Sequence, residues 1–168
     1  MEYTTSSIAL AAIGQMFKGM TGGLDKAAAH AKAVGVDETV YTGWRLAPDM
    51  FAMARQVQIA CDIPVRGLTR LAGAEPPSFP DNETTFAELK ERIAKAHAHI
   101  KSLDRARIDA DPEGEISVPV AGSPMTFRRS QFLAVFILPN LYFHATAAYL
   151  NLRNAGVPLG KADFLARD

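Results

Sequence analysis

The chain has 168 residues, of which 48% are hydrophobic and 21% are charged, and its 18 basic residues balance 18 acidic ones. This length suits one domain, residues 1–168, which can bury enough surface to be stable without a disulfide or a structural metal. A chain with no net charge and no basic block lacks the electrostatic footprint of a protein that binds nucleic acid or an anionic membrane.

The first predicted helix opens at Thr5 or Ser6, which are both good N-caps, and carries apolar residues at helical spacing. Gly22 and Gly23 interrupt this pattern before Gly35 ends it. The segment is therefore either one long helix with a weak middle or two helices that meet at the glycines.

A loop over residues 36–46 leads to the second predicted helix, which opens at Pro48 and ends at Gly73. Proline suits a first helical turn because its missing N–H has no partner there. Pro64 removes one hydrogen bond further along and predicts a kink. The three prolines within residues 74–83 predict a rigid surface loop.

The third predicted helix begins at Thr85, because Thr85 and Glu88 form the capping-box pattern. After a polar stretch, the apolar residues Ile116, Val118 and Val120 alternate with Ser117 and Pro119. The turn 121–124 then leads to a second short segment, residues 125–127. This pattern predicts a small β-hairpin.

The last predicted helix covers residues 130–155 and stops at Gly156 and Pro158. Four helix-length apolar stripes and one hairpin predict an all-α four-helix bundle with a short β-hairpin inserted before the last helix.

The last helix carries a histidine inside an apolar seam, which makes it the most informative part of the chain. Asn140 lies one turn before His144 on nearly the same face, and Pro139 leaves a backbone carbonyl free nearby. On the second predicted helix, Asp49 and Gln56 share one otherwise apolar face. If the two faces meet, Asp49, Gln56, Asn140 and His144 form a polar pocket that offers a general base or two metal ligands.

A structural interpretation stands beside this one. A single histidine on an apolar helix face is often a core residue satisfied by one hydrogen bond, which Gln56 or Asn140 would supply. Asp49 in a first helical turn also favours the helix dipole without any catalytic role.

The other histidines and the cysteine carry weaker signals. His97 and His99 lie two apart on one helix and point to different faces, so we expect both near solvent, and we expect His30 to be exposed. Cys61 is the only cysteine, which excludes an internal disulfide and fits a reducing compartment. With no signal peptide and no run of about 18 apolar residues, the simplest prediction is a cytoplasmic protein without a membrane span.

Several segments of the sequence are similar to a known family. These segments are PNLYFH at residues 139–144, GVPLGK at 156–161, LAPDM at 46–50, QVQ at 56–58 and RLAG at 70–73. They resemble an uncharacterised bacterial domain-of-unknown-function family within the DinB/YfiT-like metalloenzyme superfamily, over nearly the whole chain. The resemblance implies a DinB-like four-helix bundle, usually a homodimer, with a polar pocket between the helices.

Members of that superfamily typically bind a divalent metal through three histidines, one on the second helix and two spaced by four on the last. His144 matches one of the latter, but Asn140 and Ala148 stand four residues to either side of it. The second helix carries no histidine, so Asp49 or Gln56 would have to substitute. Such a donor set would hold zinc or nickel only weakly.

Two functional hypotheses remain, and the sequence does not decide whether the protein is an enzyme. The first is a degenerate relative of the metal-dependent bundle enzymes, whose polar pocket binds a small ligand or, weakly, a divalent metal at His144. The second is a non-catalytic dimeric helical module, in which the buried polar residues are structural and fix how the helices pack.

Overall fold

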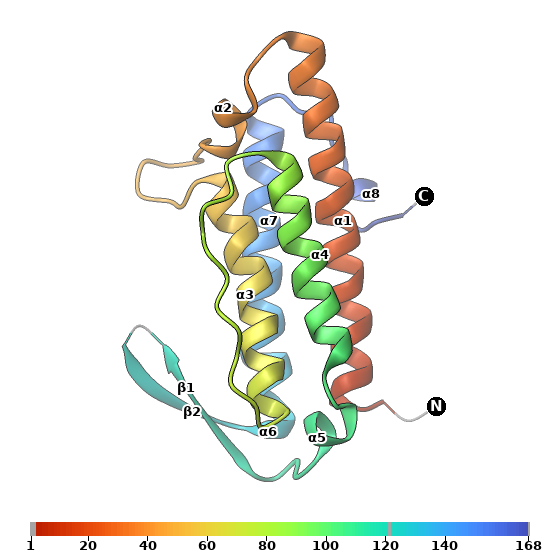
Figure 1. Ribbon diagram of the computed structural model, residues 1–168, viewed down its shortest axis with the longest axis vertical. Coiled ribbons are helices and arrows are strands. Elements are labelled where there is room, and N and C mark those ends of the chain that lie inside the picture. The colour runs from red at the N-terminus through yellow and green to blue at the C-terminus, as the bar shows by residue number, and fades with distance from the viewer. Residues whose placement is uncertain (1–2, 121, 168) are drawn as a thin grey trace.

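The apolar stripes fold into four long helices that lie side by side in the computed structural model, which describes residues 3–120 and 122–167 (Figure 1). These helices are α1 (Thr5–Val34), α3 (Met53–Leu71), α4 (Phe86–Ser102) and α7 (Leu138–Asn154). In Figure 1, α1 and α7 run upwards and α3 and α4 run downwards. The predicted four-helix bundle is confirmed.

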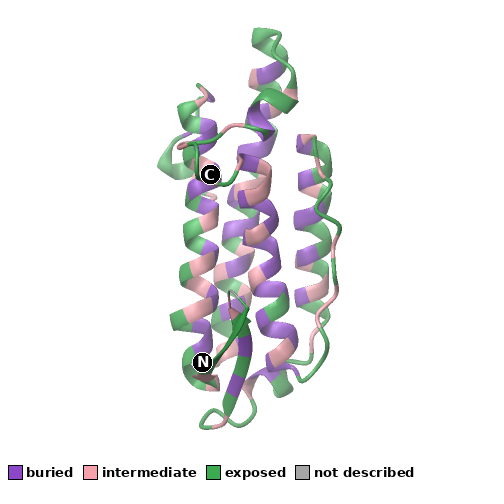
Figure 2. Ribbon diagram, turned by 90° about the vertical axis from the view of Figure 1, so that its left-hand side faces the viewer, coloured by how far each residue is buried: buried purple, intermediate pink, exposed green. Residues whose placement is uncertain are grey.

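The buried side chains form one core between these helices. Figure 2 shows buried residues along each long helix, alternating with exposed ones at the helical period. The largest apolar members include Phe17, Leu24, Met53, Phe86 and Phe132, all at most 1% exposed. Each such side chain contributes about 1.5–3 kcal/mol through its burial, so the core supplies most of the stabilisation.

Of the two interpretations of the first segment, the structure selects the single long helix. α1 continues through Gly22 and Gly23, and Gly35 ends it in the left-handed conformation with φ of 68°. Its N-cap is Thr4, whose side chain accepts a hydrogen bond from the backbone N–H of Ser7, one residue before the predicted cap.

Two short helices occupy segments that the sequence predicts to be irregular. α2 (Glu38–Thr42) and α5 (Arg105–Asp109) are each a little over one turn long. Each follows an aspartate, Asp37 or Asp104, whose carboxylate accepts a backbone N–H of the first turn. Helices this short show no apolar period, so the aspartate caps are the only sequence signal that could have predicted them.

The predicted start of the second helix at Pro48 is wrong, because α3 begins at Met53. The backbone N–H of Met50 bonds to the carbonyl of Ala47, which closes a turn around Pro48 and Asp49 instead. The N–H of Met53 then bonds to the carbonyl of Trp44. The indole N–H of Trp44 also donates to Asn154 of α7, and this tertiary contact holds the loop against the local preference of proline for a helix start.

The predicted hairpin is confirmed as β1 (Glu115–Val120) and β2 (Ser123–Arg128), which pair antiparallel. Ile116 and Val118 of β1 are buried and belong to the core. The predicted turn includes Ala121, which lies outside the described residues.

The last predicted helix is one helical run with a local widening. α6 (Arg129–Phe132) continues into a π-helical turn, η1 (Leu133–Ile137), and then into α7. The N–H of Leu138 bonds to the carbonyl of Leu133, five residues back instead of four. Pro139 follows directly, and a wider turn relieves the contact between its ring and the preceding turn.

By length and mean composition this run is long and apolar enough to cross a membrane, although Asn140 and His144 interrupt it, so it holds no unbroken run of about 18 apolar residues. Residues 129–154 reach a mean hydropathy of 1.4 in their most apolar window, and no Asp, Glu, Lys or Arg occurs from 130 to 152. A core helix of a soluble bundle meets the same criteria, and α7 packs here against α3 and α1. Only 33% of the window is buried, however, so much of this apolar surface faces outwards.

A long connection, residues 72–85, returns along the bundle from the lower end of α3 to the upper end of α4 (Figure 1). We call it the strap. Such a long irregular segment needs anchors, because it has no ladder of backbone hydrogen bonds of its own.

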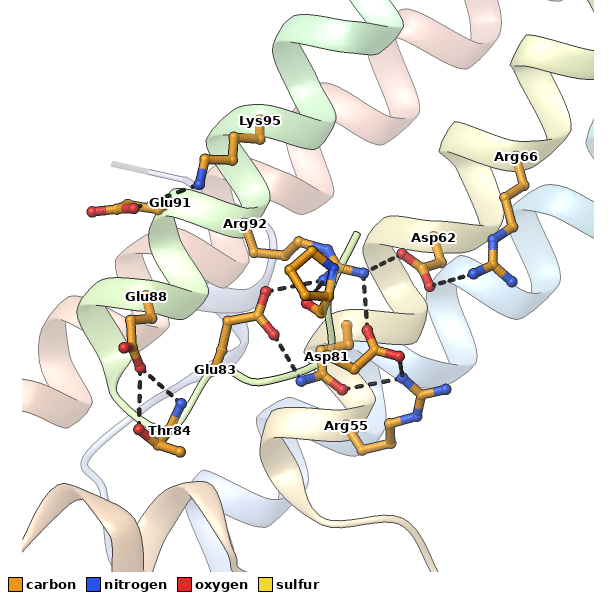
Figure 3. A network of polar contacts seen from close by, with 12 residues as sticks. Arg55, Asp62, Arg66, Asp81, Glu83, Thr84, Glu88, Glu91, Arg92 and Lys95 are labelled. Atoms are coloured by element: carbon orange, nitrogen blue, oxygen red, sulfur yellow. Dashed lines mark hydrogen bonds and ion pairs between the residues drawn. The ribbon is translucent and has the colours of Figure 1, made fainter. Parts of the chain in front are cut away.

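Arg92 on α4 is the main anchor of the strap (Figure 3). Its side chain is 1% exposed, and its guanidinium contacts the carboxylate of Asp62 on α3. The same group donates to Glu83 over 2.9 Å and to the backbone carbonyl of Pro80 over 3.0 Å, both in the strap. Burial alone would lower the pKa of Arg92, but Asp62 and Glu83 outweigh it and raise the pKa, so the guanidinium stays charged.

Replacing the buried guanidinium should therefore be costly. We expect Arg92→Met to lower the free energy of unfolding by about 3–5 kcal/mol, because Asp62 and Glu83 would lose their buried counter-charge. Arg66→Met is the matched control. Arg66 bonds to the same Asp62 carboxylate, but its side chain is 51% exposed, so we expect a loss of about 0–1 kcal/mol. Urea unfolding of both variants measures the difference, and equal losses would contradict the anchoring role.

Candidate functional site

The structure joins His144 on α7 to Gln56 on α3. The Nδ1 atom of His144 lies 2.7 Å from the Oε1 atom of Gln56. Gln56 is 1% exposed and His144 is half-buried. Since α3 and α7 pack closely against each other along the bundle, the pair lies between two rigid elements.

A second hydrogen bond fixes which ring nitrogen of His144 carries the proton. The side-chain Nε2 of Gln56 donates to the backbone carbonyl of Phe51, 3.3 Å away. A carbonyl only accepts, so this bond orients the Gln56 amide and leaves Oε1 as the acceptor that faces His144. The imidazole therefore carries its proton on Nδ1 and presents a lone pair on Nε2. Within the described part of the chain, Nε2 has no hydrogen-bond partner.

The surroundings keep this imidazole neutral. Burial lowers the pKa of His144, and the positive charge of Arg55 lowers it further. The ring of Phe143 meets the imidazole edge-on, with 5.1 Å between the ring centroids. The result is an uncharged hydrogen-bond acceptor beside an aromatic wall.

The other two predicted pocket residues do not join this pair. Asn140 is half-buried, and its Nδ2 donates to the carbonyl of Phe136 one turn back in the same helical run, over 2.8 Å. Asp49 is exposed in the turn before α3. The structure thus brings Gln56 and His144 together, while the predicted binding role of all four residues stays a prediction.

The residues present do not fit a metal centre. Within the described residues, no group of three or more His, Cys, Asp or Glu side chains could hold a metal ion. His144 would be a single ligand, with a neutral amide and no carboxylate at hydrogen-bond distance. One imidazole falls short of the three protein ligands of a catalytic zinc site.

The remaining histidines are half-buried and in contact, so His30 is not exposed as expected, while His97 and His99 remain partly open to solvent. An imidazole nitrogen of His99 lies 2.8 Å from the hydroxyl of Thr69, and the ring of His97 packs edge-on against Phe17. His30 packs in the same way against Tyr41. Cys61 is fully buried, and burial raises the pKa of its thiol, as expected for an inert cysteine.

The outward face of the α6–α7 run, which sequence reasoning missed, is apolar and exposed. Val135, Tyr142, Phe143 and Leu150 are between 40% and 61% exposed. Part of this face forms a groove of about 350 Å³, lined by Leu46, Met50, Pro139, Tyr142, Phe143, Thr146, Ala147 and Leu150. The absence of charged residues from 130 to 152 is the sequence signal that could have revealed it, because a helix with a solvated face normally carries charges there.

Comparisons with known proteins agree with the fold. The profile of a domain family of unknown function, DUF1993, matches residues 6–165. The crystal structure of a DinB family member protein from Shewanella denitrificans is similar, with 37% sequence identity and a TM-score of 0.87. The similarity covers 95% of this chain and 90% of that one. Comparison with curated proteins gives no match.

The lowered pKa of His144 predicts a pH dependence of stability. In the unfolded chain His144 binds a proton near its ordinary pKa of about 6.5, whereas the folded protein binds it only at lower pH. The unfolded state therefore binds more protons in this window, and the free energy of unfolding falls as the pH drops from about 7.5 to about 5.

The variant His144→Asn isolates this effect. Its amide can still donate to Gln56 Oε1 but does not titrate, so we expect a smaller loss of stability over the same pH range. Comparing urea unfolding of the wild type and the variant also cancels the contribution of His97, whose pKa is lowered by burial and by Lys101. Equal pH dependence in both proteins would show that His144 does not titrate as inferred.

Proposed function

The chain belongs to the DUF1993 family and has a DinB-like fold, and from that premise we propose that it binds a small organic ligand at His144. The observation that carries the proposal is the chain of hydrogen bonds from Phe51 through Gln56 to His144, which leaves Nε2 as an unpaired acceptor. Gln56 acts as the positioning residue, because it holds both the ring orientation and the tautomer.

The chemistry of the site narrows the ligand. A neutral imidazole accepts a hydrogen bond from an alcohol, a thiol or an amide N–H, and the ring of Phe143 favours a ligand with an apolar body. An acidic ligand would protonate Nε2 of His144, and the resulting positive charge on a half-buried ring is unfavourable. We therefore propose that the ligand is an uncharged hydrogen-bond donor that carries an apolar group and binds without a metal.

Two substitutions separate binding from structure. His144→Asn can keep the donor to Gln56 but lacks an acceptor at the position of Nε2. His144→Gln places an acceptor near the position of Nε2 but loses the donor to Gln56. We expect only His144→Gln to retain weak binding and only His144→Asn to retain wild-type stability at neutral pH.

The measurement is an NMR screen of small alcohols, thiols and amides against the wild type, followed by the two variants. Ligands that shift the His144 and Phe143 ring signals in the wild type should lose at least about tenfold in affinity in His144→Asn. If no compound shifts these signals, and His144→Ala costs about 1–3 kcal/mol of stability, His144 is structural. That outcome would support the alternative, a non-catalytic module.

A second proposal, which also serves the non-catalytic alternative, is that the chain forms a homodimer through the apolar face of the α6–α7 run. The exposed side chains on this face recur at helical spacing, so two copies can pack the same stripe against each other about a two-fold axis. Exposed apolar patches of this kind mark interaction sites in soluble proteins. The lack of charge on the face removes the repulsion that two identical surfaces would otherwise meet.

Phe143→Glu tests the dimer, because it places a charge at the centre of the face. We expect the wild type to sediment as a dimer and Phe143→Glu as a monomer in analytical ultracentrifugation. Ile8→Glu is the control: Ile8 is 42% exposed and lies on α1, outside the α6–α7 run, so its replacement should leave the dimer intact. A stable dimer should persist at protein concentrations of about tens of micromolar. If the wild type sediments as a monomer at that concentration, the proposal is refuted.

We also propose a cytoplasmic location. The single cysteine is free and buried, which suits a reducing compartment.

A further inference from the structure

A half-enclosed apolar cavity lies in the bundle, between α1, α3 and α7. Its volume is about 30 Å³. Its walls are apolar apart from Asp163, and the lining includes Gly23 on α1, Met53 on α3, and Ala148 and Tyr149 on α7. Such a cavity gives a water molecule few polar partners.

The C-terminal tail forms the remaining wall. The short helix α8 (Lys161–Phe164) packs across α1, and Leu159, Asp163 and Phe164 complete the lining of the cavity. Phe164 also meets the ring of Tyr149 at 5.6 Å between centroids. The C-terminal tail of the chain therefore covers the cavity by packing on the bundle.

The contacts of α8 are few and lie near the surface. Lys26 pairs with Asp163 over 2.6 Å, and their side chains are 53% and 23% exposed. Gln15 donates to the carbonyl of Leu165 over 3.0 Å. None of the residues of α8 is fully buried, whereas Val157 and Leu159 before it are. The tail is thus anchored up to Leu159 and only lightly held beyond it.

Two glycines on α1 make room for α8 and for the cavity, although glycine lowers the stability of a helix. A Cβ atom on Gly19 would lie 2.4 Å from the backbone oxygen of Phe164, so only glycine lets α8 dock there. At Gly23, a Cβ atom would meet nothing closer than a carbon of Leu159 at 3.9 Å. Alanine would therefore fit at Gly23, strengthen the helix and reduce the cavity, yet the chain leaves the space open.

From these observations we propose that the cavity is a binding site for a short alkyl chain and that α8 is its lid. The apolar lining selects a hydrocarbon group, and because the half-enclosed cavity holds only about 30 Å³, α8 has to move outward as the chain enters. Asp163 on the lid is the one carboxylate in the lining, and it is already paired with Lys26. This site lies on other residues than His144 and does not rest on the proposal made for that residue.

Straight-chain alcohols from 1-butanol to 1-octanol are the probes, with binding to the whole chain followed by NMR. We expect affinity to rise by about threefold to fourfold for each added methylene until the site is full, because each buried CH₂ contributes about 0.8 kcal/mol. Signals of Ala148 and Tyr149 should shift on binding. The backbone N–H of Leu165, which bonds to Lys161, should exchange with solvent at a different rate once the lid has moved.

Matched glycine variants test the site itself. Gly23→Leu fills the cavity and should weaken 1-hexanol binding at least about tenfold. Gly22→Leu is the control, since Gly22 is exposed and a Cβ atom there has no neighbour within 4 Å, so binding should be unchanged. Ala148→Leu fills the same cavity from α7 and replaces Gly23→Leu if that variant does not fold.

The lid is tested separately with Gly19→Ala, which displaces α8 through the contact with Phe164. We expect faster association and dissociation of 1-hexanol and faster hydrogen exchange at Leu165. The proposal fails if the wild type binds no alcohol up to its solubility limit, or if Gly23→Leu and Ala148→Leu bind as the wild type does. Unchanged exchange rates in a folded Gly19→Ala variant would overturn the role of α8 as a lid.

Discussion

Arg92 is the largest side chain that the bundle buries fully, and its charge must be compensated inside the protein. The need arises from the topology. Because α3 and α4 run in the same direction, the chain has to return along the whole bundle between them, and the strap that does so has no regular structure (Figure 1). Asp62 from α3 and Glu83 from the strap meet the Arg92 guanidinium from α4. One buried cation thus holds three segments in a single arrangement.

This arrangement also positions the candidate site. Gln56 lies on α3 between Arg55, which contacts Asp81 of the strap, and Gln58, whose amide donates to Glu83 over 2.9 Å. The strap therefore fixes the rotation of α3 from its outer side, and that rotation points Gln56 towards α7. The charge network of the strap thus borders the candidate site, because Arg55 belongs to it and also lowers the pKa of His144.

Two helices, α1 and the α6–α7 run, show a second kind of dependence, in which one stretch of sequence meets more than one structural requirement. The glycines in the middle of α1 look like a helix interruption, but α1 continues because its packing in the bundle and the docked tail compensate for their low helix propensity. The apolar last helix is similar: its charge-free stretch supplies the core on one side and an exposed face on the other.

The sequence by itself determined the four long helices, the hairpin, the cap at Thr85 and the stop at Gly35, because apolar periodicity and capping act over a few residues. It also singled out Gln56 and His144, but it grouped them with Asn140 and Asp49, which do not join the pair in the structure. The place of Asp49, the buried ion pair of Arg92 and the docking of the tail on Gly19 were decided only by the tertiary structure. Each of these depends on which segments distant in sequence become neighbours, and local patterns do not carry that information.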